Sequence, residues 1–442
     1  MNSAAALVTI YMLFNCVTYA LVSRSIRPAS LYNGLKTRSS SVSRINYKTV
    51  IKAPIFDEKC ELTGITLTRY IVETISLNPS LREMESLIIA IQTACKTIAS
   101  VVDRAPITGM TGLQSGGGSI NVQGEEQKRL DVVTNEILKK ALRFSGKVGV
   151  LASEEEDAPV DVNSLTKELR STQFKTDVVL EEIGGKYIAV FDPLDGSSNV
   201  DAGIPTGTIF GIFEEDPDAV CEVDFDNPNN PNVECLASTL RPGNNLVAAG
   251  YCLYSSSVFF CLTLGNGVNI FTLDRQIGEF VLTHQNLQIP KRGKIYSFNE
   301  ANRNDWDKPL LDYVSAIQQG KGESGKQYSA RYIGSMVGDV HRTLLYGGIF
   351  GYPATSKVPN GKLRLLYEAA PMSFLIEQAG GLGTTGKNRI MDIQPQTVHQ
   401  RVPCFLGSHD DVAEVKKYYD ACTDPAIIAR CKERLNPKMD KK

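Results

Sequence analysis

The chain has 442 residues, 42% hydrophobic and 22% charged, which is ordinary for a soluble globular protein and long enough for two packed lobes. The formal net charge is −2, but residues 1–56 contain seven Lys or Arg and no acidic residue, so the remainder carries 40 basic against 49 acidic residues. That balance argues against nucleic acid as a partner of the mature chain.

Residues 1–56 are expected to be a bipartite targeting leader. An apolar run, 4–22, has the length of a secretory-signal core, with cleavage expected near 20–23. The Ser- and Arg-rich, acid-free stretch 23–44 is typical of a transit peptide. Together they predict import into the stroma of a complex plastid, one bounded by extra membranes. A membrane anchor and a secreted protein are the alternatives; the apolar run barely reaches spanning length, so no membrane association is expected of the mature form.

Helices are predicted first after the leader. Apolar residues at helical spacing favour helices within 64–104. The Gly-rich segment 114–122 is expected to be either a mobile lid or a plain linker. An amphipathic helix is predicted over 123–144; it contains Asp131, which without context reads as a surface charge.

A short buried strand at 148–152 follows and ends in the acidic run 153–157. The most informative segment comes next: 191–199, Phe-Asp-Pro-Leu-Asp-Gly-Ser-Ser-Asn, at the end of a second predicted strand. Paired carboxylates at Asp192 and Asp195 suit Mg²⁺, and the Gly-Ser-Ser that follows offers N–H and hydroxyl groups to a phosphate. Each acidic segment alone could be a solvated turn. Two acidic strand ends are better explained as converging on shared cations.

The rest of the chain predicts strands from 186 to 283, interrupted by an acidic insertion at 214–240, and then a second lobe. The expected fold class is α/β, with lobes 57–286 and 287–434. Helices are expected at 365–380 and 410–420. Glu368 lies among apolar residues, where a carboxylate is rarely buried without a partner or a metal.

These motifs resemble fructose-1,6-bisphosphatase. The resembling segments are 66–70, 153–155, 191–199, 206–212, 242–251, 293–300, 330–342, 346–354 and 362–368. The resemblance implies the layered αβαβα architecture of sugar phosphatases. It also implies Mg²⁺-dependent hydrolysis of the 1-phosphate of fructose 1,6-bisphosphate, with two or three ions per site and Mn²⁺ as an alternative. Such a reaction would serve plastid carbon metabolism (the Calvin cycle).

By this resemblance the metal ligands are Glu154, Glu155, Asp192, Asp195 and Glu368, with the Leu194 carbonyl. Asp131, Glu155 and, less strongly, Glu125 are the candidates for orienting or deprotonating the attacking water. The residues expected to bind substrate are Gly196, Ser197, Ser198, Asn299, Arg331, Tyr332, Tyr352, Lys362 and Arg364. Arg331 matches an arginine that reaches a neighbouring subunit's site in this family. Asn302 stands where the family commonly has a second tyrosine, so a changed distal-phosphate pocket is expected.

The resemblance also predicts regulation. Cys221 and Cys235 lie in the acidic insertion and match a loop whose disulfide thioredoxin opens in chloroplast enzymes. Leu240 replaces a third cysteine of that loop. The nucleotide-inhibition site of cytosolic relatives is expected to be lost, because Glu214 replaces a basic residue there. A homo-oligomer, expected to be a tetramer, is implied as well. Sedoheptulose-1,7-bisphosphatase and a non-enzymatic protein that retains the fold are the alternative functions.

Overall fold

A computed structural model of the chain describes residues 51–52, 54, 64–112, 128–156, 158–161, 185–215 and 239–433. Residues 50–442 form one compact unit. The Gly-rich segment, Glu125, the cysteine pair Cys221 and Cys235, and the targeting leader except for its residues 51, 52 and 54 lie outside the described residues.

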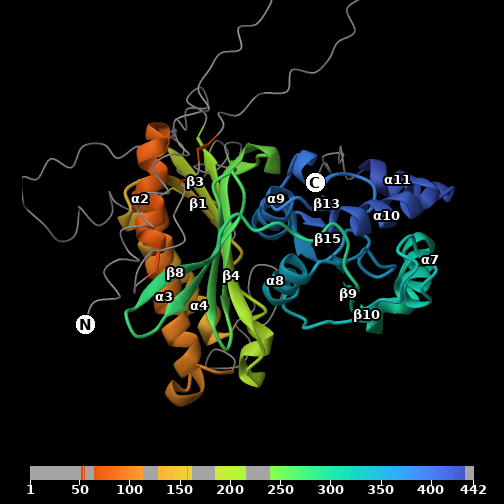
Figure 1. Ribbon diagram of the computed structural model, residues 1–442, viewed down its shortest axis with the longest axis horizontal. Coiled ribbons are helices and arrows are strands. Elements are labelled where there is room, and N and C mark those ends of the chain that lie inside the picture. The colour runs from red at the N-terminus through yellow and green to blue at the C-terminus, as the bar shows by residue number, and fades with distance from the viewer. Residues whose placement is uncertain are drawn as a thin grey trace, which may run out of the picture. The chain divides into compact units, whose positions relative to one another are not determined.

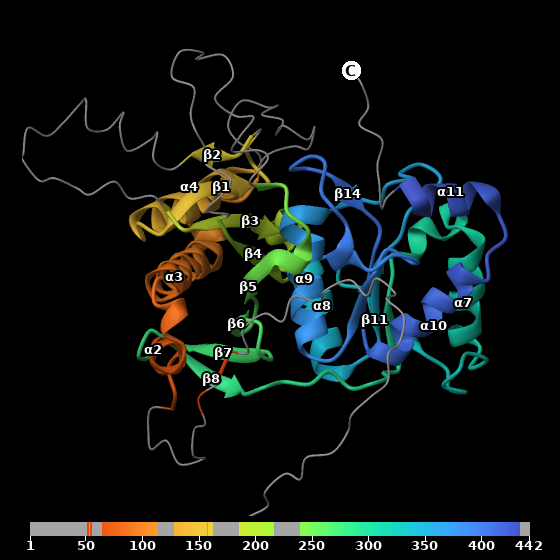
Figure 2. The same ribbon diagram turned by 90° about the horizontal axis from the view of Figure 1, so that it is seen from above.

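Five layers of helix and strand lie side by side (Figure 1, Figure 2). The first layer contains helices α2 (Leu67–Leu77), α3 (Met84–Thr108) and α4 (Arg129–Phe144). Among the described residues, α3 alone has the length and hydropathy of a membrane span; here its apolar side chains form part of the core. Together with the four layers described next, these helices confirm the expected αβαβα architecture.

The second layer is an eight-stranded sheet in the order β2-β1-β3-β4-β5-β6-β7-β8. Only the β1–β3 pair is parallel, and the remaining pairs are antiparallel. The strands are β1 (Val148–Ser153), β2 (Val160–Asp161), β3 (Tyr187–Asp195), β4 (Thr206–Glu214), β5 (Leu246–Tyr254), β6 (Val258–Thr263), β7 (Asn269–Asp274) and β8 (Glu279–His284).

The third layer contains α8 (Met336–Tyr346) and α9 (Ala370–Gln378), which lie between the two sheets (Figure 1). The fourth is a five-stranded sheet in the order β10-β9-β11-β15-β13. Its strands are β9 (Ile295–Ser297), β10 (Ser329–Ala330), β11 (Ile349–Tyr352), β13 (Leu382–Thr384) and β15 (Cys404–Gly407). The fifth layer comprises α7 (Lys308–Gln318), α10 (His409–Asp420) and α11 (Pro425–Glu433).

Short elements connect these layers. A two-stranded sheet pairs β12 (Leu363–Arg364) with β14 (Arg401–Val402), and a π-helical turn, η5 (Leu365–Ala369), leads from β12 into α9. The 3₁₀ turns are η1 (Pro79–Leu81), η2 (Ser197–Ala202), η3 (Gly243–Asn245), η4 (Glu300–Asp305) and η6 (Ile390–Asp392).

Apolar side chains fill all the spaces between the layers. One cluster lies between the first helices and the large sheet, a second between the two sheets, and a third beneath α7, α10 and α11. Both faces of β3 are therefore buried, which explains why its sequence is apolar without alternation. The carboxylates at its end therefore belong to a strand that is packed on both faces.

Two predicted helices differ from those observed. Lys128 is extended, and α4 begins at Arg129 rather than at 123, because the Asp131 carboxylate accepts the Lys128 N–H and caps the first turn. The helix predicted over 365–380 starts as the π-turn η5 before continuing as α9.

Candidate active site

The site lies where the ends of β1 and β3 meet α4, the start of α8 and η5. A pocket there is lined by Lys128, Asp131, Glu154, Glu155, Asp192, Leu194, Asp195, Gly196, Ser197, Ser198, Tyr332, Gly334, Ser335, Met336, Asp339, Phe350, Tyr352, Lys362, Leu363, Arg364 and Glu368. The structure thus brings together residues more than two hundred positions apart, including most of those expected from the sequence.

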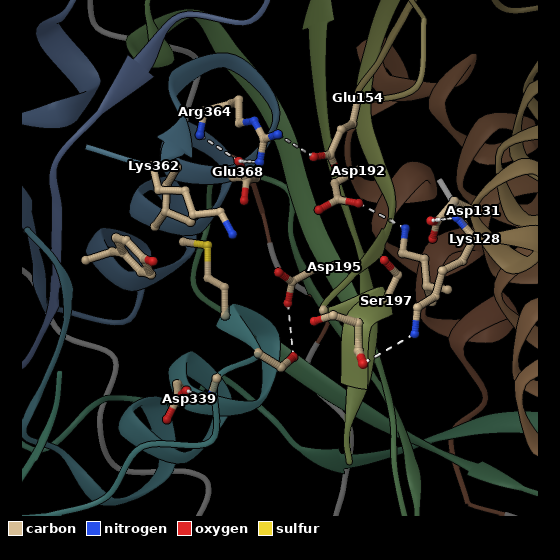
Figure 3. A pocket seen from close by; sticks show the side chains of 18 of the residues that line it. Lys128, Asp131, Glu154, Asp192, Asp195, Ser197, Asp339, Lys362, Arg364 and Glu368 are labelled. Atoms are coloured by element: carbon tan, nitrogen blue, oxygen red, sulfur yellow. Dashed lines mark hydrogen bonds and ion pairs between the residues drawn. The ribbon is translucent and has the colours of Figure 1, made fainter. Parts of the chain in front are cut away.

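Three carboxylates form the centre of the pocket. Asp192, Asp195 and Glu368 each offer an oxygen, and these oxygens lie within 4.8 Å of one another. Figure 3 shows the three side chains facing a common space. Since Asp192 and Asp195 come from β3 and Glu368 comes from η5, the cluster exists only when these two elements are packed together.

Burial and mutual repulsion disfavour the charged forms of this trio. Burial, and then the negative charge of Glu154, raises the pKa of Asp192 well above its usual range. Burial raises the pKa of Asp195 to about 6, although the Val337 N–H and the Ser335 hydroxyl both donate to its carboxylate. Burial raises the pKa of Glu368 to about 8, and the Arg364 guanidinium only partly opposes this shift.

The backbone around Asp192 explains the geometry at the end of β3. Its carboxylate accepts the Leu194 N–H at 2.9 Å, and the Thr208 hydroxyl donates to the Pro193 carbonyl at 2.9 Å. Pairing with β4 shifts register between Asp192 and Asp195, so this turn bulges out of the sheet. Gly196 then adopts a φ of +74°, and a Cβ there would lie 3.0 Å from that of Ser335.

Arg364 joins the acidic turn after β1 to η5. Its Nη2 lies 3.0 Å from Glu154 Oε1, and its main-chain N–H donates to Glu368 Oε2 at 2.6 Å. Arg364 is 4% exposed, so this ion pair is shielded from solvent. Glu155 also lines the pocket, beside Glu154.

Asp131 and Lys128 form the wall on the α4 side (Figure 3). Burial raises the pKa of Asp131 to about 6, opposed by hydrogen bonds from the Lys128 N–H and the Ser197 side chain. The Lys128 ammonium donates to Asp201 at 2.9 Å and to the Ser198 carbonyl at 3.3 Å. These bonds hold the positively charged Lys128 ammonium beside the Gly-Ser-Ser segment.

The opposite wall holds part of the expected distal-phosphate pocket. Tyr332, Tyr352 and Lys362 line the cavity as expected. Asn299 does not: its side chain caps η4 by accepting the Ala301 N–H. Arg331 also lies outside the lining; it is exposed, and its guanidinium donates to the Ala330 carbonyl.

Sequence reasoning missed Lys128, Ser335 and Asp339. Asp339 is buried in α8, and its carboxylate accepts from the Ile333 and Gly334 N–H groups and from Ser297. It therefore fixes the loop that carries Tyr332 and Ser335. An acidic residue within Met-Val-Gly-Asp-Val is the same signal that identified Glu368, and could have identified Asp339.

The donor set suits a divalent cation. Buried carboxylates with raised pKa values are stabilised in their charged form by a positive ion, and oxygen ligands are those that Mg²⁺ prefers. Asp192, Asp195 and Glu368 fit this requirement by proximity, and Glu154 and Glu155 lie in the same pocket.

Known proteins are similar to this chain in sequence and in fold. The models of the N-terminal and C-terminal domains of fructose-1,6-bisphosphatase match residues 65–285 and 289–420. The chain is 53% identical to the chloroplastic fructose-1,6-bisphosphatase of Oryza sativa subsp. indica over 80% of this chain and 82% of that protein. It is 47% identical to that of Brassica napus over 90% and 95% of the two chains.

A solved structure agrees. The holo form of Leishmania major fructose-1,6-bisphosphatase superimposes with a TM-score of 0.71 and 39% identity, covering 81% of this chain and all of that one. With the acidic pocket at the junction of both matched domains, these similarities show that the chain belongs to the fructose-1,6-bisphosphatase family.

Proposed function

We propose that this protein hydrolyses the 1-phosphate of fructose 1,6-bisphosphate to give fructose 6-phosphate and phosphate, in the Calvin cycle of a plastid. The observation that carries the proposal is one pocket holding a carboxylate trio beside basic and hydroxyl groups suited to phosphate. The names of the curated relatives, chloroplastic fructose-1,6-bisphosphatases, support both the substrate and the compartment.

Fructose-1,6-bisphosphatases are metal-dependent, and Mg²⁺ is the cation proposed here. Glu154, Glu155, Asp192, Asp195, Glu368 and the Leu194 carbonyl would hold it, with two or three ions per site. When bound, such ions would neutralise the phosphoryl oxygens and activate the attacking water.

The chain's own groups would do the remaining work. Asp131, whose pKa of about 6 leaves it mostly ionised at neutral pH, would orient the attacking water and accept its proton. Gly196, Ser197 and Ser198 would hold the phosphate that is cleaved. Tyr332, Tyr352 and Lys362 would bind the distal phosphate and so align the reacting one.

Compartment, assembly and regulation complete the proposal. The bipartite leader would direct the protein to the stroma of a complex plastid, where it would assemble as a homotetramer. Thioredoxin would activate it by reducing a Cys221–Cys235 disulfide. The Arg241 guanidinium donates to the Glu214 carbonyl at 2.6 Å, which ties together the two described ends of the insertion that carries these cysteines.

Phosphate release by the purified protein tests the activity. With Mg²⁺, release from fructose 1,6-bisphosphate is expected, and D195N and E368Q should abolish it while the protein stays folded. Faster release from sedoheptulose 1,7-bisphosphate would reassign the substrate. No release from either sugar would leave a non-enzymatic protein with the same fold, an alternative disfavoured by the five proposed acidic ligands, Glu154, Glu155, Asp192, Asp195 and Glu368, all of which are retained in the pocket.

A further inference from the structure

The acidic turn after β1 contains a third glutamate that does not line the pocket. Glu154 and Glu155 do, but the Glu156 carboxylate instead accepts from Asn135 Nδ2 at 2.9 Å and from Lys139 Nζ at 2.6 Å. Both donors belong to α4. Glu156 therefore fastens the turn to the first helical layer.

A second set of bonds fixes the same turn. The Ser153 hydroxyl donates to Asn135 Oδ1 at 2.8 Å and accepts the Glu155 N–H at 3.3 Å. Ser153 and Asn135 are buried, at 1% and 5% exposure. The main chain that presents Glu154 and Glu155 is thus held firmly on its α4 side.

His399 holds the turn from the other lobe. Its Nε2 lies 3.0 Å from the Glu156 carbonyl oxygen, and its Nδ1 lies 2.9 Å from the Tyr367 hydroxyl. A carbonyl can only accept, so Nε2 carries the hydrogen; in the neutral ring Nδ1 then accepts from the hydroxyl. The Tyr367 and His399 rings also meet edge to face, with centroids 5.8 Å apart.

The two residues that His399 contacts are each next to proposed metal ligands in the sequence. Glu156 directly follows Glu154 and Glu155, and Tyr367 directly precedes Glu368. We propose that His399 is a positioning residue that sets the separation between the two halves of the metal site, an inference that rests on the metal site proposed above.

Arg364 also connects the turn after β1 with η5, but it does so through carboxylate oxygens. Its guanidinium pairs with the Glu154 carboxylate itself, so it competes with a cation for that oxygen. The two bonds of His399 to Tyr367 and Glu156 engage a hydroxyl and a main-chain carbonyl, and hold the segments together without occupying a carboxylate oxygen.

Metal binding tests the proposal directly. Mn²⁺ affinity of the purified full chain can be measured from the electron paramagnetic resonance signal of the free ion, with no substrate present.

H399F keeps a planar ring but removes the hydrogen bonds to Tyr367 and Glu156, and it should weaken Mn²⁺ binding by about tenfold, as losing a group that orients metal ligands does. Y367F should have a similar effect. The double variant should be no worse than either single one, since either change already breaks the bridge. H399Q, which can still donate to the Glu156 carbonyl, should fall between H399F and the native protein.

The chain supplies a matched control. Tyr251 and His341 form the same kind of pair, with the hydroxyl 2.8 Å from Nδ1 and ring centroids 5.9 Å apart, but neither lines the pocket. H341F should lower the melting temperature and leave Mn²⁺ affinity unchanged.

Each contrary result has a separate meaning. Native protein that binds no Mn²⁺ would remove the proposed metal site and this inference with it. Native binding with unchanged affinity in folded H399F, Y367F and H399Q would overturn the role of His399 alone. Equal loss of affinity in H341F would show that general destabilisation, rather than positioning, is the cause.

Discussion

Glu368 is a carboxyl group buried beside other acids, and the same is true of Asp195. Their pKa values, about 8 and about 6, lie above the values of roughly 4 expected in an unfolded chain. Without a cation, the folded protein therefore binds more protons than the unfolded protein between about pH 4 and pH 8. The free energy of unfolding should fall as pH rises through this window, and the part of the loss that Glu368 contributes should be complete above its folded-state pKa.

Thermal unfolding in a chelator measures this first prediction. The melting temperature should be lower at pH 8 than at pH 6, and Mg²⁺ should raise it more at pH 8, where the carboxylates are charged. E368Q cannot ionise at that position, so its melting temperature should depend less on pH. An identical pH dependence in E368Q and native protein would place the effect elsewhere.

Asp131 gives a second prediction at this scale. The substitution D131N keeps the shape of the side chain but removes its ability to accept a proton, so kcat should fall by about 10²- to 10⁴-fold. The Mg²⁺ concentration for half-maximal activity should change little, since Asp131 is not a proposed ligand. Steady-state kinetics separate the two quantities, and an undiminished kcat would exclude Asp131 as the base.

Among the elements, the layered class and the two strands β1 and β3 were predictable, because buried strands are apolar and polar residues mark their ends; the predicted end of β3 at Asp192 was three residues short of the observed end at Asp195. The start of α4 was not: the amphipathic pattern extends upstream of Arg129, whereas the Lys128–Asp131 bond determines where the helix begins. The π-turn at Glu368 was also missed, because residues 365–376 are all buried and so present no amphipathic pattern that an inserted residue could shift.

The candidate site was predictable to the extent that its residues lie in local motifs. Glu154, Asp192, Asp195 and Glu368 stand in such motifs, and the structure brings them into one pocket. Asp339 was missed although it also lies in an apolar context, whereas His399 acts through a contact with a segment 243 residues away, which no spacing in the sequence reveals. Whether Asn299 and Arg331 bind substrate stays a prediction.

A third prediction concerns inhibition by AMP. Glu214 of β4 pairs with Lys186 at 2.7 Å, and Arg82, Glu83 and Glu85 surround a shallow hollow nearby. Because the acidic groups repel a nucleotide phosphate and Glu214 engages Lys186, AMP should inhibit weakly or not at all. A titration of the activity with AMP measures this, and strong inhibition at low micromolar AMP would contradict it.

At the scale of the whole molecule, the active pocket is assembled from the end of the large sheet and from the segments that lead into α8 and α9. The insertion lies in sequence between β4 and β5, which are neighbouring strands of the large sheet. Because β4 pairs with β3, a covalent constraint in that insertion would act on a strand next to the one that carries the proposed metal ligands Asp192 and Asp195.

Thiol reduction tests this fourth prediction. Treatment with a dithiol should raise activity most clearly at limiting Mg²⁺, and the C221S/C235S variant should be active without it. Activity that is the same before and after reduction, in a sample shown to contain the disulfide, would remove the redox switch and leave the enzyme assignment intact.

The distance in sequence between Asp192 and Glu368 also orders events during synthesis. A ribosome completes β1 and β3 long before it reaches η5, so an emerging chain carries the first carboxylates without the last. The proposed metal site can be complete only after η5 has packed beside β3. Only a chain synthesised past residue 368 would therefore have the full set of proposed ligands, and a shorter chain should bind the metal more weakly.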